Sequence, residues 1–63
     1  MNMKNSLFMN AQEVAELLGT SKAYAYKLIQ RLNEELAKEG YITIQGKVNR
    51  SFLKKRIYGE DQS

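Results

Sequence analysis

The sequence predicts a small, mainly α-helical domain with a β-hairpin, and three observations support that fold class. Apolar residues recur at helical spacing within residues 11–18 and again within residues 22–39. A single glycine, Gly19, separates these two stretches at a sharp turn. A segment rich in aromatic and β-branched residues then leads to the turn signal Gln45-Gly46. The 63 residues should form one domain, 1–63, with an ordered core from about residue 7 to about residue 58.

The first predicted helix begins at Ala11. Asn10 is a favourable N-cap residue, and Glu13 stands three residues later, where a capping box places its acidic partner. Gly19 follows the last apolar residue and suits a left-handed C-cap, so the helix should end there. The buried stripe of this helix, at spacings of three and four residues, is expected to be Val14, Leu17 and Leu18.

The second predicted helix begins after Ser21 or Thr20, either of which can act as its N-cap. Gly40 should close it behind Lys38, whose charge suits a helix C-terminus, which gives about 18 residues. Its apolar residues fall on one face. We expect that face to bury Ala25, Leu28, Ile29, Leu32 and Leu36.

The other side of the second helix carries residues that suit contact with DNA. A cation can reach phosphate or guanine oxygens, a hydroxyl can bond to either, and a small side chain lets a helix lie deep in a major groove. The two tyrosines lie on the flanks of the buried face, where they either contact a ligand or cover the edge of the core. The candidate contact residues are Ser21, Lys22, Ala23, Tyr24, Tyr26, Lys27 and Arg31.

A small hairpin is predicted from Tyr41 to Asn49, in one of two registers. A two-residue turn at Gln45-Gly46 would place Thr43 opposite Val48. A three-residue loop through Lys47 would place Ile44 opposite Val48 instead. We prefer the three-residue loop because it buries the apolar side chains together on one face; these are Ile42, Ile44 and Val48.

Two shorter segments complete the prediction. Residues 7–9 should form an extended segment against the core. A last short helix should follow, with Asn49 or Ser51 as its N-cap, and Gly59 should end it. In that helix we expect the apolar residues to face inward and the lysines outward; Tyr58 fits either side. The inward set is Phe52, Leu53 and Ile57, and the outward set is Lys54 and Lys55.

The composition narrows the possible functions. The chain has no cysteine and no histidine, which excludes disulfides, Cys/His zinc sites, thiol catalysis and a histidine base. We therefore expect no enzyme activity, cofactor or metal site. No apolar run approaches the roughly 18 residues of a membrane span, so we expect a soluble cytoplasmic protein.

The charge distribution points to a polyanionic partner. The net charge is +3, and residues 41–59 contain five cations and no acid, which favours one basic face. Within this segment, Arg50, Lys54 and Lys55 are further candidates for contact with the DNA backbone. A protein-interaction module that uses Tyr24, Tyr26 and the acidic end of the second helix is the alternative to DNA binding.

The run EVAELLGTSKAYAYKLIQRLNEELAKEGYITIQGKV resembles the small winged helix-turn-helix proteins of the excisionase and MerR-like type, found in phages and integrative elements. The resemblance covers roughly residues 7–58. It implies that the second helix reads the major groove of double-stranded DNA and that a wing, Gln45, Gly46 and Lys47, touches the adjacent backbone or minor groove.

The resemblance also implies two possible roles. Excisionase relatives bend DNA at an attachment site and direct an integrase towards excision, often together with further copies on neighbouring sites; small transcriptional regulators use the same groove contacts. The stretch Ala23-Tyr24-Ala25-Tyr26 departs from the family, in which small hydroxyl and β-branched residues are commoner there. This departure leaves the base preference open.

Overall fold

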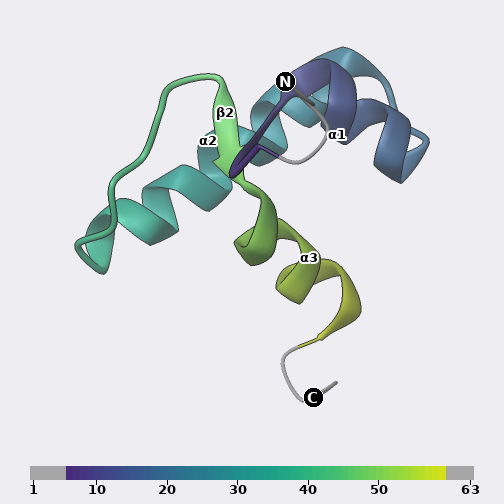
Figure 1. Ribbon diagram of the computed structural model, residues 1–63. Helices are drawn as coiled ribbons and strands as arrows, with labels where there is room; N and C mark the ends of the chain where they lie inside the picture. The colour runs from purple at the N-terminus through teal and green to yellow at the C-terminus, as the bar shows by residue number, and fades with distance from the viewer. Residues whose placement is uncertain (1–5, 60–63) are drawn as a thin grey trace.

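Three helices pack around a two-stranded antiparallel sheet in the computed structural model, which describes residues 6–59 (Figure 1). The elements in order are β1 (Phe8–Asn10), α1 (Ala11–Leu18), α2 (Lys22–Lys38), β2 (Lys47–Asn49) and α3 (Arg50–Tyr58). The mainly helical, winged-helix-like fold class is therefore confirmed. Residues 1–5 and 60–63, which flank the predicted ordered core, lie outside the described residues.

The start of α1 has the predicted capping box. The Asn10 side-chain oxygen accepts a hydrogen bond from the Glu13 N–H at 2.8 Å, and the Glu13 carboxylate accepts one from the Asn10 N–H at 2.9 Å. The helix ends at Gly19, whose backbone is left-handed (φ 71°, ψ 35°) and whose N–H donates to the Ala15 carbonyl. Both ends of α1 are therefore fixed by residues within four positions of each other.

Replacing Gly19 by valine should destabilise the protein through the backbone. An added Cβ at Gly19 would meet no atom within 4 Å, so the Cβ itself causes no clash. A left-handed conformation costs a β-branched residue about 1–3 kcal/mol, and each kcal/mol lowers the Tm of so small a domain by about 4–8 °C. Thermal unfolding followed by circular dichroism measures this loss. Gly19→Asn is the control, because asparagine tolerates the left-handed region and its Tm should fall much less. Equal unfolding midpoints for the two variants would contradict a left-handed backbone at position 19.

Both ends of α2 are also closed by local hydrogen bonds. The Ser21 hydroxyl accepts from the Tyr24 N–H at 3.1 Å, so Ser21 rather than Thr20 is the N-cap. At the other end the Tyr41 N–H donates to the Leu36 carbonyl at 3.0 Å, and Gly40 takes a positive φ of 89°. This is a Schellman arrangement, with the helix one residue shorter than predicted because Glu39 is already the C-cap.

Small residues allow α1 to pack closely against α2. Ala11 and Ala15 are 2% and 7% exposed, while Leu17, predicted to be buried, is 45% exposed. The buried stripe runs through positions 11, 14, 15 and 18, and position 17 lies about 110° from its centre at 100° per residue. The prediction for Leu17 is therefore wrong. The core consists of Met9, Ala11, Val14, Ala15, Ala25, Ile29, Leu32, Val48 and Leu53, with Leu18, Leu28 and Phe52 partly buried against it.

The second strand pairs mainly with β1 and not with the segment before it. Met9 lies opposite Val48 in an antiparallel register, and both side chains are buried. The predicted extended segment at residues 7–9 is therefore a true partner strand, from residue 8 to residue 10, although Leu7 itself is 73% exposed.

The preferred hairpin register is wrong, and the two-residue turn is observed. Ile44 bridges Lys47, whose N–H donates to the Ile44 carbonyl at 3.0 Å. Gly46 has a positive φ of 81° and Gln45 does not, which is the pattern of a type II turn. Such a turn splays the strands that it joins, so pairing stops after one bridge. As a result Ile42 is 84% exposed and Ile44 is 42% exposed, and neither joins Val48 in the core.

The last helix begins at the end of β2 and packs through one buried residue. The Asn49 side chain accepts from the Phe52 N–H at 2.9 Å, so Asn49 rather than Ser51 is the N-cap. Leu53 is 1% exposed, but Ile57, predicted to face inward, is 40% exposed because the second half of α3 extends away from the sheet (Figure 1). The described part of α3 ends where predicted, with the Gly59 N–H bonded to the Lys55 carbonyl at 2.7 Å.

Candidate nucleic-acid interface

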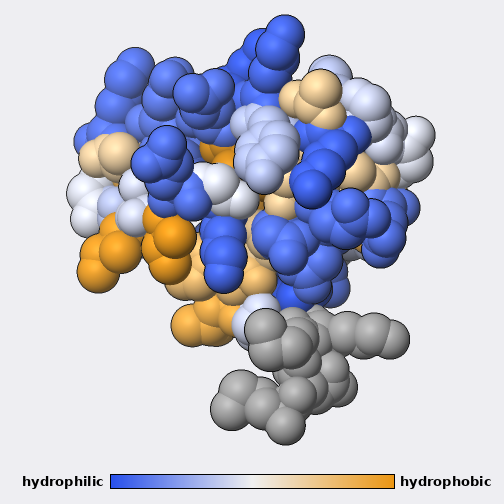
Figure 2. All heavy atoms as spheres, turned by 90° about the horizontal axis from the view of Figure 1, so that it is seen from above, coloured by the Kyte–Doolittle hydropathy of each residue, from blue (hydrophilic) through white to orange (hydrophobic). Residues whose placement is uncertain are grey.

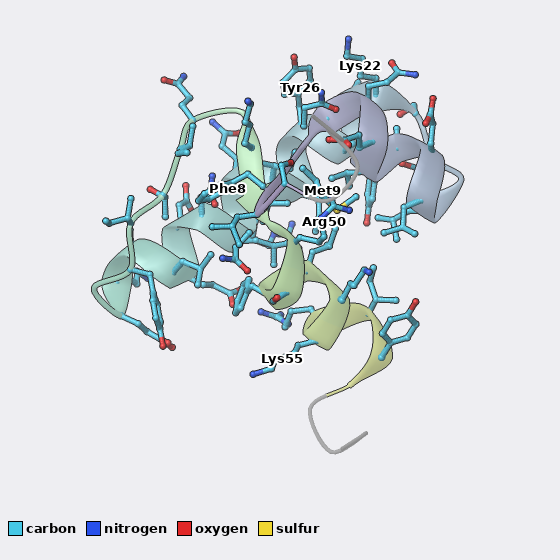
Figure 3. All side chains as sticks on the ribbon, in the orientation of Figure 1. Phe8, Met9, Lys22, Tyr26, Arg50 and Lys55 are labelled. Atoms are coloured by element: carbon cyan, nitrogen blue, oxygen red, sulfur yellow. The ribbon has the colours of Figure 1, made fainter. Side chains whose placement is uncertain are left out.

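The first turns of α2 present polar and aromatic side chains to solvent. Ala25 and Ile29 are 0% and 1% exposed, so the opposite side of the helix points outward. In Figure 3, Lys22 and Tyr26 project from the same upper side of the molecule. All seven residues predicted for this face are exposed, namely Ser21, Lys22, Ala23, Tyr24, Tyr26, Lys27 and Arg31.

The two tyrosines of this face are half exposed. Tyr24 is 54% exposed and Tyr26 is 51% exposed, on either side of the buried Ala25. About half of each residue is therefore open to solvent, so each tyrosine can present a ring face and a hydroxyl to a partner. Both groups suit contact with sugar, phosphate or a base edge.

Exposed positive charge lies on this side of the molecule. Three exposed cations lie in the first ten residues of α2, and a fourth begins β2 directly after the turn. The acids of α2 lie in its C-terminal half, at positions 34 and 35, where Lys38 also lies. Figure 2 looks onto the molecule from above and shows mainly hydrophilic residues, with hydrophobic residues gathered towards one edge. The four cations are Lys22, Lys27, Arg31 and Lys47.

The predicted wing lies beside the exposed face of α2. A groove of about 300 Å³ separates the Gln45-Gly46 turn from the helix. Its lining comprises Tyr26, Ile29, Gln30, Asn33, Gln45 and Gly46. Of the predicted site residues, the groove brings together Tyr26 on the helix side and Gln45 and Gly46 on the wing side. Lys47 is exposed next to the turn but does not line the groove.

Besides the core residue Ile29, two polar residues of this groove are absent from the predicted site. Gln30 lies four positions after Tyr26, so it continues the outward stripe by one turn, and this spacing is a signal that the sequence contains. Asn33 lies three positions further on, but its contacts are with the wing, 11 and 14 residues away in the sequence. No local pattern indicates contacts of that kind.

Arg50 differs from the other predicted cations because its side chain is engaged within the protein. Its Nε donates to the Ser6 carbonyl at 2.8 Å, and its guanidinium lies 3.8 Å from the Glu13 carboxylate. The side chain is 22% exposed. The Arg50 side chain therefore ties the start of α3 to the segment before β1 and to α1, and a phosphate contact would require it to leave these partners.

The two lysines of α3 are exposed but lie on a different part of the surface. Figure 3 shows Lys55 at the opposite end of the molecule from Lys22. Lys54 precedes it on the same helix and is likewise exposed. The structure does not bring these lysines together with the α2 face and the wing.

Residues 6–59 contain neither a candidate metal site nor a candidate membrane span. No group of three or more His, Cys, Asp or Glu side chains is placed to hold a metal ion. Across the same residues, no helix is both long and apolar enough to cross a membrane.

Comparison with known proteins gives a relative with a similar sequence. The chain is 41% identical over 44 residues to the ICEBs1 excisionase of Bacillus subtilis (strain 168), and the match covers 70% of this chain and 69% of that protein. The matched length exceeds the helix-turn-helix segment, so the similarity extends beyond this widespread motif. No family model and no solved structure matches the chain.

Proposed function

The chain belongs to the excisionase family of the ICEBs1 excisionase, and on that premise we propose that it binds duplex DNA as a recombination directionality factor of a mobile element. In this role it has no catalytic activity of its own. It places itself on an attachment site, shapes the DNA and directs an integrase, alone or with further copies on neighbouring sites. The interface is formed by α2 and the turn before β2.

One observation supports this proposal most strongly: the exposed face of α2 and the Gln45-Gly46 turn border the same groove. An α-helix is about 10–12 Å wide with its side chains, and the major groove is about 12 Å wide. The small side chain of Ala23 near the helix start permits a close approach. With α2 in the major groove, the turn would face the neighbouring sugar-phosphate backbone or minor groove.

The residues divide by role within this proposal. Lys27 and Tyr24 point outward from the inserted helix and contact base edges, whereas Lys47 contacts a phosphate from the wing. Arg50 acts mainly by holding the fold together. Lys54 and Lys55 would reach phosphates only where the DNA curves around the molecule, or on a neighbouring duplex segment.

Binding to duplex DNA should weaken steeply with salt. If the four exposed cations of the interface neutralise roughly four phosphates, log K falls against log[salt] with a slope of about −4. Titration of the protein into a labelled duplex by fluorescence anisotropy, at several salt concentrations, measures this slope. A single-stranded oligonucleotide of the same sequence is the control. No duplex binding at low salt, or a slope near zero, would overturn the proposal and favour the protein-interaction alternative.

A reconstituted reaction tests the recombination role separately. A plasmid that carries both ends of the element is incubated with purified integrase, with and without this protein. We expect the protein to raise the yield of the excised circle. Unchanged recombination, together with altered transcription from a nearby promoter, would favour the alternative of a small transcriptional regulator.

A further inference from the structure

The side chain of Asn33 bridges α2 to the wing. Its Nδ2 donates to the Ile44 carbonyl at 3.1 Å and to the Lys47 carbonyl at 2.8 Å. Both partners are acceptors, so only the NH₂ end of the amide fits between them, and both of its N–H groups are used. The two carbonyls flank the Gln45-Gly46 turn, which places a single amide across the base of the wing.

The wing needs such a support because its own pairing is weak. The chain enters the wing through residues 41–44 and leaves it through β2, and a single bridge, Ile44 to Lys47, joins these two arms. β1 pairs with β2 but not with the incoming arm. The incoming arm has little apolar attachment, since Tyr41 is 61% exposed and Ile42 is 84% exposed. Because a two-stranded unit with so few contacts is marginal in water, hydrogen bonds from outside the hairpin decide where it rests.

We propose that Asn33 is the positioning residue of the interface, which sets the width of the groove between α2 and the wing. It touches no DNA in this proposal. By holding the turn against the helix before DNA arrives, it lets Lys47 reach a phosphate while α2 lies in the major groove. Because the wing is then ordered before DNA binds, no conformational entropy is lost in ordering it during binding. This inference rests on the proposed function and identifies what aligns its two contact elements.

Hydrogen exchange in the absence of DNA tests whether the two hydrogen bonds of Asn33, which we call the clamp, hold the turn against α2. In Asn33→Ala, the Lys47 amide, which donates to the Ile44 carbonyl, should exchange roughly tenfold faster by NMR, because local opening of the turn becomes easier. Amides in the middle of α2 should keep their protection. Gln12→Ala is the matched control, since it deletes an exposed amide that bonds within α1. Unchanged Lys47 exchange in Asn33→Ala would overturn the clamp.

A double-mutant cycle tests what the clamp does for binding. Duplex affinity is measured for the wild type, Asn33→Ala, Lys47→Ala and the double variant at several salt concentrations. We expect either single change to reduce the salt slope by about 1, and the second change to add little to the first. If Asn33 does not position Lys47, the two substitutions should act independently and their effects on binding free energy should add. Additive effects would therefore overturn the role of Asn33.

The two arms of the experiment separate the inference from the proposed function. If the wild type fails to bind duplex DNA at low salt, the proposed function falls, and the positioning role falls with it. If the wild type binds but Lys47 exchange or the cycle gives the contrary result, only the role of Asn33 is overturned.

Discussion

Replacing Ile29 by alanine should remove a large part of the stability of the fold. Ile29 is 1% exposed and is among the largest fully buried side chains of the core. An isoleucine-to-alanine change at such a site costs about 2–5 kcal/mol, whereas a domain of this size has a total stability of roughly 3–9 kcal/mol. Urea or thermal unfolding measures the loss. We expect the Tm to fall by about 10 °C or more.

Two other isoleucines provide matched controls for this change. Ile42 is 84% exposed, so Ile42→Ala should alter stability by only about 0.5 kcal/mol. Ile57 is 40% exposed and should fall between the other two. A cost at Ile57 equal to that at Ile29 would contradict the packing of α3 and would support the inward position that the sequence pattern predicts.

Local interactions were predictable from the sequence because the residues that make them are neighbours. Asn10 and Glu13 lie three positions apart, and Gly19 closes its helix by bonding to Ala15. Ser21 caps α2 through Tyr24, again three positions away. Such contacts depend on residue types at fixed short spacings, so a pattern of side chains is enough to place them.

Contacts between distant segments were not predictable in the same way. The pairing of Met9 with Val48 joins two strands of only three residues each, too short for an alternating pattern to show. The bond from Arg50 to Ser6 spans 44 residues. The hairpin register depended on the turn type at Gln45-Gly46, and the observed type II turn leaves a single bridge where the sequence pattern favoured a paired hairpin.

In the candidate site, too, the local part was predictable from the sequence and the part that joins distant segments was not. Helical periodicity placed Lys27 and Tyr24 on the outward face of α2 because one helix determines that face. The position of the wing relative to this face depends on the turn geometry at Gly46 and on Asn33. Gln30 follows from its spacing to Tyr26, but neither the groove nor the contacts of Asn33 follow from spacing along the chain.

The helix and the wing should respond differently to substitution. Lys27→Ala and Tyr24→Ala should each lower the ratio of specific to non-specific affinity, because a good contact to a base edge gives about 1–3 kcal/mol of discrimination. Lys47→Ala should weaken binding to all duplexes alike and reduce the salt slope by about 1, as loss of a phosphate contact does. Circular dichroism must show that each variant keeps its fold.

The most direct measurement compares these three variants on a selected high-affinity site and on a scrambled duplex of equal length, at several salt concentrations. We expect Lys27→Ala and Tyr24→Ala to bring the two affinities closer together, and Lys47→Ala to leave their ratio unchanged while both fall. If Lys47→Ala instead alters the ratio, and both α2 variants preserve it, then the wing reads the sequence and α2 is not the recognition helix.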